Sequence, residues 1–389
     1  MSRPLRVAVV ITRLEGGAGI QALRGARALD PAAFSITLIT GQDDGLRGEA
    51  VSSGLDCAVE PALRTPIDPL ADRRALARLG SLFRQRRFDV VHTHTAKAGT
   101  LGRLAAHRVG VPRIVHTYHG FPFHEFQSLA RRRAYVAIER RLGRHTDLAL
   151  CVGTGVAAEA IRRRLLLPER IATIGVAVEG VGTDAAPPYP ATPQVRAKAR
   201  LALGVAVDAT VVGAVGRLTY QKAPEHFVTA LRKLGRDVTG VWIGSGELAG
   251  RVADQARAAG VRLILPGERA DVPALLPAFD VFALPSRYEG LPTAVVEAMV
   301  AGVPVVATTV NAVSDVVTPG ETGLLVPPQR PELLARAVRY LLDHPVAAAR
   351  MAGAAHDSIG SRYSEAALAD ALQAAYLADR PTAAVAAWP

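Results

Sequence analysis

The sequence predicts an α/β protein with two doubly wound domains whose parallel sheets face each other across a cleft. The chain has 389 residues, enough for two domains that each bury a core of their own. Hydrophobic residues make up 49% of it but aromatic residues only 5%, a balance typical of small-residue helices packed closely on Val-rich strands. Short apolar runs alternate with helical patterns along the whole chain, and this alternation favours parallel sheets.

The first predicted domain spans residues 1–185 and is Rossmann-like. Each of its expected strands is a short apolar or β-branched run bounded by polar residues or glycine. These strands are expected at residues 7–12, 35–40, 89–92, 114–117 and 148–152.

A linker rich in Gly and Pro is expected at residues 175–193, where seven residues are of these two types. The second Rossmann-like domain, residues 186–362, repeats the strand–helix rhythm of the first. Residues 363–389 form a C-terminal helix and tail, which can pack on either domain. The strands of the second domain are expected at residues 210–215, 241–243, 262–265, 281–284 and 303–307.

Two cations follow a glycine at the carboxyl end of the strand expected at residues 210–215. Gly216 ends this strand, and Arg217 and Lys222 lie in the loop behind it. Arg holds phosphate oxygens in a fork and Lys holds them as a point charge. The segment is therefore a candidate anion site, although two surface cations explain it equally well. The next strand ends at Gly244 and Gly246, where a glycine turn lets the backbone approach a ligand.

Two glutamates bracket the start of an expected helix whose first residue is Pro292. Glu289 is placed in the loop before this helix and Glu297 in its second turn, among apolar residues. An ionised carboxylate is costly to bury without partners, and ligand hydroxyls would supply them. The alternative is a glutamate that is half exposed or paired with an arginine.

The first domain contributes glycines and histidines. Gly16 and Gly17 open a helix after the first strand, so their amides can face a phosphate or a hydroxyl. The G-x-G-x-x-G spacing of dinucleotide sites is absent. Six of the ten histidines lie between His92 and His124, and we expect His119 to point into the cleft. Because no Cys, His and Asp set has zinc spacing, we expect no metal. Because the dinucleotide spacing is missing as well, we expect no resident cofactor.

The strand–Gly–Arg–Leu segment with Lys222, the Gly-Ser-Gly-Glu turn at residues 244–247 and the two glutamates together resemble the retaining glycosyltransferases of family 4, which have the GT-B fold. The resemblance covers nearly the whole chain, including residues 301–307 and 320–326. Residues 92–99 and 116–123 look like the branch of the family that acts on exopolysaccharides and lipid-linked glycans. The family often has glycine where this chain has Ala223, which puts the geometry of that loop in question.

The resemblance implies a role for each candidate residue. Arg217 and Lys222 would neutralise the diphosphate of a nucleotide-sugar donor, and Glu297 would accept the ribose hydroxyls. The transferred sugar would contact Glu289, Thr293 and the backbone of Gly290 and Leu291, and His119 would face it from the first domain. Gly16 and Gly17 would lie near the donor phosphates and the acceptor. Retention is usually assigned to attack from the side of the leaving group, so no protein nucleophile is required.

The implied substrates are a UDP-sugar and a glycan or lipid-linked acceptor, and the charge distribution agrees with a lipid carrier. Residues 1–185 hold 27 Lys or Arg and 17 Asp or Glu, a balance of +10 within a net charge of +11. An excess of basic residues attracts an anionic membrane surface but is equally compatible with a solvated protein surface. We do not expect nucleic acid as a partner. Without a visible leader or apolar span, we expect a cytoplasmic enzyme, with peripheral contact at the inner face of the cell membrane as one option.

Two other functions fit the same architecture. A non-hydrolysing UDP-sugar epimerase would also bind a nucleotide sugar in the cleft, but it fits the two-glutamate region less well. A non-catalytic nucleotide-sugar-binding subunit would be expected to lack a phosphate cation or the histidine, whereas Arg217, Lys222 and His119 are all present.

Overall fold

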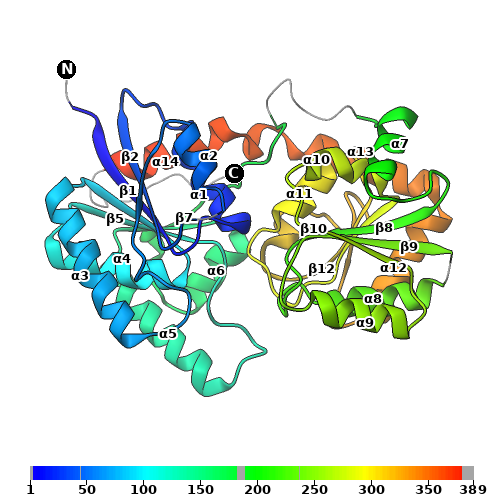
Figure 1. The fold of residues 1–389 in the computed structure, drawn as a ribbon, viewed down its shortest axis with the longest axis horizontal. Helices are drawn as coiled ribbons and strands as arrows, with labels where there is room; N and C mark the ends of the chain where they lie inside the picture. The colour runs from blue at the N-terminus through cyan, green and yellow to red at the C-terminus, as the bar shows by residue number, and fades with distance from the viewer. Residues whose placement is uncertain (1–2, 44, 182–188, 236, 379–389) are drawn as a thin grey trace. The chain divides into compact units, whose positions relative to one another are not determined.

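The computed structural model describes residues 3–43, 45–181, 189–235 and 237–378. The predicted domain boundary at residues 185/186, the linker residues Gly182, Pro187 and Pro188, and the tail from residue 379 lie outside them. The chain divides into two compact units, Met1–Ala177 with Ser364–Pro389 and Val178–Tyr363 (Figure 1). We call these unit 1 and unit 2.

Unit 1 is built on a parallel sheet in the order β3-β2-β1-β4-β5-β6-β7. All five strands expected in this part of the chain are present, within three residues of their expected ends. The short edge strands β3 and β7 were not predicted. The strands are β1 Leu5–Ile11, β2 Phe34–Thr40, β3 Asp56–Val59, β4 Val90–His94, β5 Arg113–Tyr118, β6 Leu148–Cys151 and β7 Ile171–Thr173.

Helices connect successive strands of unit 1, as parallel pairing requires. Helix α3 shows how local sequence sets a boundary: Asp68 caps its first turn by accepting hydrogen bonds from the amides of Leu70 and Ala71, and Pro69 occupies the first helical position. The helices are α1 Gly16–Ala28, α2 Arg47–Ser52, α3 Pro69–Arg86, α4 Ala96–Val109, α5 Leu129–Gly143, α6 Thr154–Arg162, the short η1 Pro168–Arg170, and α14 Glu365–Leu377.

Helix α14 belongs to unit 1 although it follows the whole of unit 2 in sequence. It packs on α1, where a Cβ atom on Gly25 would lie only 2.6 Å from Leu372 Cδ1. Glycine at this position therefore allows the two helices to approach closely. Tyr376 packs edge-on against Phe34 of β2, with ring centroids 6.0 Å apart. This return of the last helix to the first domain is one of the two positions expected for it.

Unit 2 holds a parallel sheet in the order β10-β9-β8-β11-β12-β13. The five expected strands are again present, and the short edge strand β13 was not predicted. The strands are β8 Thr210–Val215, β9 Val238–Ile243, β10 Leu263–Gly267, β11 Val281–Leu284, β12 Val305–Thr308 and β13 Leu324–Val326. The helices are α7 Pro193–Ala202, α8 Pro224–Leu234, α9 Ala249–Ala258, α10 Val272–Leu275, η2 Leu276–Ala278, α11 Thr293–Val300, η3 Asn311–Asp315, α12 Pro331–Asp343, α13 Pro345–Ile359 and η4 Ser361–Tyr363.

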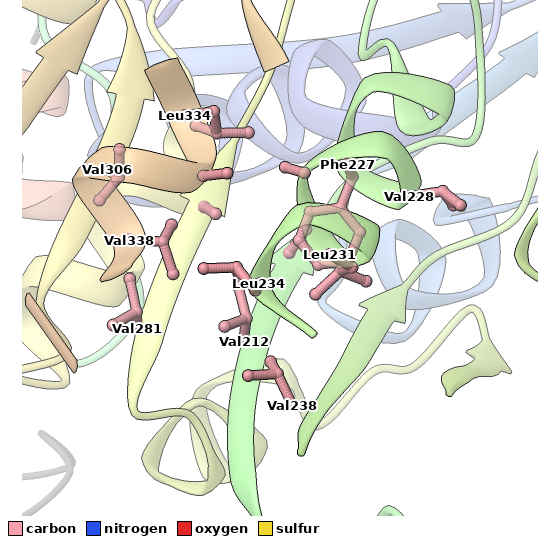
Figure 2. Close-up of a cluster of buried hydrophobic side chains, with 14 of the residues drawn as sticks. Val212, Phe227, Val228, Leu231, Leu234, Val238, Val281, Val306, Leu334 and Val338 are labelled. Carbon is pink, nitrogen blue, oxygen red and sulfur yellow. The ribbon is translucent and has the colours of Figure 1, made fainter. Parts of the chain in front are cut away.

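One hydrophobic cluster of unit 2 lies where α8 and α12 meet its sheet. Figure 2 shows Phe227 and Leu231 of α8 and Leu334 and Val338 of α12 gathered with Val212 and other strand residues. Full burial of side chains of this size stabilises a fold by roughly 1.5–3 kcal/mol each. This packing holds β8 and β11 in place, and the loops that follow these two strands carry most of the predicted site residues.

The observed architecture confirms the predicted fold class, two doubly wound parallel-sheet domains. Among the described residues, no helix has both the length and the apolar character needed to cross a bilayer.

Candidate functional site

The loop after β8 begins at Gly216, whose φ of 146° is disfavoured for residues with a Cβ atom. A Cβ atom there would lie 3.1 Å from Lys222 Cε, so glycine leaves room for the Lys222 side chain beneath the end of the strand. The carbonyl of Gly216 accepts a 2.7 Å hydrogen bond from Trp242 Nε1. Arg217, the next residue, is exposed. One predicted cation is thus enclosed and the other reaches solvent.

Gly244 and Gly246, after β9, let their loop pack against the loop after β8. A Cβ atom on Gly244 would lie 2.2 Å from the carbonyl oxygen of Gly216, and one on Gly246 would lie 2.4 Å from that of Leu218. The Leu218 amide donates to the Ser245 carbonyl at 2.8 Å. These glycines therefore allow the two loops to pack closely together. Their contact with a ligand stays a prediction.

Lys222 and Glu289 form the most enclosed ion pair of this region. The Lys222 ammonium donates to Glu289 Oε1 at 2.6 Å, and the two side chains are 14% and 4% exposed. Ser286 Oγ donates to the same carboxylate oxygen at 2.5 Å, and Gln221 Nε2 donates to Oε2 at 3.1 Å. Because β8 and β11 are paired neighbours, the loops after them meet at one edge of the sheet. Three donors thus fix the orientation of a buried carboxylate.

Three residues that support this pair were not singled out from the sequence. Ser286 and Gln221 hold the Glu289 carboxylate. Arg287 braces the two loops: its guanidinium lies over the Tyr220 ring at 4.0 Å, donates to the Tyr220 carbonyl at 2.6 Å and pairs with Glu225. Ser286 and Glu289 lie only three positions apart, so their spacing was a sequence signal for this contact. The contacts of Gln221 and Arg287 join loops that follow different strands. They depend on the order of strands in the sheet, and the sequence contains no comparable signal for them.

The backbone of Ala223 is left-handed, at the position where the family often has glycine and where the loop geometry was in question. It adopts φ 51° and ψ 51°, the left-handed conformation, immediately before Pro224 begins α8. Glycine adopts this conformation without steric cost, whereas a residue with a Cβ atom is strained by roughly 1–2 kcal/mol. Alanine therefore occupies a glycine-type turn, and the lysine before it still reaches Glu289.

The helix that carries Glu297 begins at Thr293, one residue later than predicted. Pro292 has ψ 101°, an extended conformation, and acts as the N-cap residue instead of the first helical residue. Glu297 lies in the second turn of α11, as expected, and is half-buried. Thr293 and Leu291 are also half-buried, and Gly290 is buried. The loop and the first turn of α11 thus place these four residues in sequence behind Glu289.

In unit 1, Gly16 and Gly17 begin α1, which follows β1 after a four-residue loop, and Gly16 has φ 59°. His119 follows β5 and is half-buried. In the sheet, β4 lies between β1 and β5, so the two groups are separated by roughly 10 Å of sheet width. The structure therefore places them at the same carboxyl edge of the sheet, on different strands.

His119 Nε2 lies 2.8 Å from His94 Nδ1, at the end of β4. Burial lowers the pKa of His119 to about 4, so its imidazole is neutral near pH 7. Thr93 and His116 form a second buried pair at 2.8 Å in the same region. Among the described residues, no group of three or more His, Cys, Asp or Glu side chains is arranged to hold a metal ion.

In unit 2, the arrangement offers an exposed guanidinium, an enclosed ammonium and a fixed carboxylate at one sheet edge. Such a set can bind a polyanion through its cations and hydroxyl groups through its carboxylate. Unit 1 offers a neutral imidazole and a helix N-terminus at the same edge of its own sheet.

Comparisons with known proteins identify the family. The model described as Glycosyltransferase Family 4 matches residues 15–179, and the one described as Glycosyl transferases group 1 matches residues 209–344. A relative from Escherichia coli, UDP-Gal:alpha-D-GlcNAc-diphosphoundecaprenol alpha-1,3-galactosyltransferase, is 32% identical over 286 residues, which cover 72% of each chain.

Solved structures agree on the fold. A crystal structure of HepE from Anabaena in complex with UDP-glucose superimposes with a TM-score of 0.81 at 20% identity, covering 95% of this chain and 98% of that one. WaaG, a glycosyltransferase involved in lipopolysaccharide biosynthesis, superimposes with a TM-score of 0.76 at 16% identity, covering 96% of this chain and 100% of its own. The chain belongs to glycosyltransferase family 4 and is an enzyme of the hexosyltransferase class that uses a nucleotide-sugar donor, with the GT-B fold.

Proposed function

We propose that this enzyme moves a hexose-type sugar from a UDP-sugar to a hydroxyl of a glycan or lipid-linked acceptor in cell-envelope or exopolysaccharide synthesis, with retention of configuration and without a metal. The observation that carries the proposal is the Lys222–Glu289 ion pair at 2.6 Å. It places a cation and a buried carboxylate at the carboxyl ends of neighbouring parallel strands, where such sheets bind ligands. UDP-glucose in HepE and UDP-Gal in the name of the Escherichia coli relative favour a UDP-sugar.

The charge of each candidate residue indicates which part of the nucleotide-sugar donor it would bind. An ammonium group has three donors, so Lys222 can bind phosphate oxygens while one donor stays with Glu289. Arg217, exposed in the same loop, adds a guanidinium fork for the diphosphate. We assign Glu289 to the hydroxyls of the transferred sugar, with Thr293 and the backbone of Gly290 and Leu291.

The half-buried carboxylate of Glu297, on α11, is assigned to the ribose hydroxyls. It lies eight residues beyond Glu289, in the second turn of the helix that follows the sugar-binding loop. In unit 1, His119 is assigned to the transferred sugar, and Gly16 and Gly17 to the donor phosphates and the acceptor. With these assignments, Glu289 binds the transferred sugar and Glu297 binds the ribose of the donor.

The transfer breaks the bond between the anomeric carbon and the diphosphate oxygen. Negative charge develops on the diphosphate and positive charge on the sugar ring, so fixed cations at the leaving group stabilise the transition state. The acceptor oxygen forms the new glycosidic bond on the face that the diphosphate leaves, and its proton passes to a diphosphate oxygen. Arg217 and Lys222 supply the positive charge that a divalent metal would otherwise provide, so chelators should leave the rate unchanged.

A lipid-linked acceptor requires access to a membrane, and one surface of unit 1 suits it. We define the α5–α6 basic surface as Arg140, Arg141, Arg144 and Arg164, which are all exposed. Among the described residues, none of these four forms an ion pair with a carboxylate. Arg140 Nε donates to the Arg163 carbonyl at 2.7 Å, which ties the end of α5 to the end of α6. Exposed Ile138, Ile161 and Leu167 lie on or directly beside these helices and add apolar contacts.

Vesicle co-sedimentation tests this surface. We expect binding to phosphatidylglycerol vesicles at low salt and none to phosphatidylcholine vesicles. Reversing Arg140, Arg141 and Arg144 to glutamate should weaken binding at least about a hundredfold, since each basic residue near an anionic surface contributes about 1 kcal/mol. The control reverses Arg73 and Arg74, which are exposed on α3. Equal binding of all three proteins would remove the membrane contact.

The proposed function is tested by incubating the enzyme with UDP-, GDP- and ADP-sugars while following thermal stability and nucleotide release. A transferase releases UDP slowly without acceptor and faster with a lipid-linked glycan. An epimerase changes the donor sugar, and a binding subunit is stabilised without turnover. Nuclear magnetic resonance of the product then reports the anomeric configuration, and inversion would overturn the retaining assignment.

A further inference from the structure

A chain of buried side chains leads from helix α14 to His119. His92 Nδ1 lies 2.7 Å from the Tyr376 hydroxyl of α14, and His92 Nε2 lies 2.7 Å from Thr117 Oγ1 of β5. Both ring nitrogens of His92 are therefore partnered and its ring is fixed. The His94 ring packs on it with centroids 4.2 Å apart. His94 in turn touches His119, so the position of this candidate sugar-binding residue is tied to the unit 1 core.

The pair of His94 and His119 has only two neutral arrangements. Their contact joins Nδ1 of one ring to Nε2 of the other, and a hydrogen bond between neutral imidazoles needs one donor and one acceptor. If His94 Nδ1 donates, His119 carries its own proton on Nδ1. If His119 Nε2 donates, His94 carries its proton on Nε2. The two rings therefore always share the same tautomer.

The surroundings of His94 favour the first arrangement. His94 is only 4% exposed, and its Nε2 atom has no hydrogen-bond partner among the described residues. The cavity bordering it is lined by apolar side chains, among them Val9, Ala22 and Leu372, and by polar ones that hydrogen-bond elsewhere. Gln21 bonds the backbone of Ala177, and Thr117 and Tyr376 bond His92. A proton on Nε2 would create a buried donor without an acceptor, and such donors are rarer in proteins than buried acceptors without a donor.

We propose that His94 is a positioning residue that holds His119 in the Nδ1–H tautomer by donating a hydrogen bond to its Nε2 atom. His119 then presents an N–H donor at Nδ1, suited to an oxygen acceptor such as a sugar hydroxyl. This consequence rests on the proposed function, whereas the tautomer itself does not. Burial, followed by the charges of His92, His119 and His116, lowers the pKa of His94 well below its ordinary value. Both rings are therefore neutral near pH 7.

The tautomer is read directly by long-range proton–nitrogen correlation spectra of protein labelled with nitrogen-15 in histidine. We expect the wild-type His119 signals to show a proton on Nδ1 only. Asn at position 94 can place an amide donor near the position of the lost Nδ1, whereas Leu has a similar size and no donor. His94→Asn should therefore keep the wild-type pattern, and His94→Leu should give a mixture of tautomers. His344→Asn, at an exposed histidine, is the matched control and should change nothing at His119.

Three results would overturn the proposal: Nε2–H on His119 in the wild type, averaged tautomers in the wild type, or an unchanged pattern in His94→Leu. If the enzyme is active, His94→Leu should also lower kcat/KM for the nucleotide sugar about tenfold, and His94→Asn should restore most of it. Absence of transfer with every nucleotide sugar would refute the proposed function and leave the spectra informative. If the enzyme transfers sugar but the tautomer of His119 does not depend on His94, only the role of His94 is refuted.

Discussion

The Lys222 ammonium lies 2.6 Å from the Glu289 carboxylate, so one ion pair joins the loops that follow β8 and β11. The pair does two things in the proposed site. It orients the glutamate for a sugar hydroxyl, and it keeps the lysine extended toward the edge of the sheet. Changes at either residue should therefore affect both structure and turnover, and the two effects have to be measured separately.

Removal of either proposed phosphate cation should slow the reaction sharply. We expect Lys222→Ala and Arg217→Ala each to lower kcat at least about a hundredfold, the size of effect seen when a transition-state oxyanion donor is lost. Steady-state UDP release with saturating acceptor measures this. Lys233→Ala, at an exposed lysine on α8, is the control and should keep wild-type rates. Near-normal turnover in both site variants would sink the leaving-group assignment.

The two glutamates should separate kinetically. Glu289→Gln should chiefly lower kcat, because the charge assigned to the reacting sugar is lost while the side-chain shape is kept. Glu297→Gln should chiefly raise KM for the donor, because ribose hydroxyls bind equally in the ground state and the transition state. Equal effects of the two substitutions on both parameters would count against this division.

Ala223 offers a test of backbone strain. Ala223→Gly relieves the strain of the left-handed conformation, but it removes a buried methyl group and raises the entropy of the unfolded chain. Because these effects oppose each other, the free energy of unfolding should change by less than about 1 kcal/mol. The same substitution at Ala230, buried in the middle of α8, relieves no strain and should destabilise by about 1–2 kcal/mol. Urea unfolding compares the two. Equal losses would mean that Ala223 is not strained.

The strands were predictable because their apolar runs are long and buried. β1 and β8 each end in five consecutive buried residues. The strands β3, β7 and β13 escaped prediction because they are short and only partly buried, as edge strands are. With three or four residues and a weak apolar pattern, they resemble loops in sequence and gain their hydrogen bonds from a neighbour already in place.

The candidate site was predictable in its motif residues and not in their partners. Lys222 and Glu289 were identified separately from the chemistry of their side chains, but their contact depends on the pairing of β8 with β11. The contact of His94 with His119 likewise depends on the register of β4 and β5, which sets His94 opposite Thr117. Sheet order joins residues that are 67 and 25 positions apart, and no local pattern encodes that.

Buried histidines should make the protein sensitive to mild acid. Burial, with a smaller effect of the His119 charge, lowers the pKa of His92 to about 3. Because the unfolded chain binds its proton near pH 6.5 and the folded chain does not, stability is full above pH 6.5. It should fall as pH decreases from there toward 3, by about 1.4 kcal/mol per pH unit for each such histidine.

Urea unfolding of His92→Gln should show a pH slope shallower by about that amount, because one buried histidine is gone. His344→Gln, at an exposed histidine, should keep the wild-type slope. If His92→Gln keeps the full slope as well, the acid sensitivity comes from other groups.

Calorimetric titration of UDP into the wild type and Lys222→Ala shows directly whether the Lys222–Glu289 edge of unit 2 binds the donor diphosphate. We expect the wild type to bind UDP and Lys222→Ala to bind it at least about tenfold more weakly, since a charge-assisted hydrogen bond contributes roughly 1.5–3 kcal/mol. Lys233→Ala should bind like the wild type. Equal affinity of Lys222→Ala and the wild type for UDP would show that Lys222 does not bind the donor diphosphate.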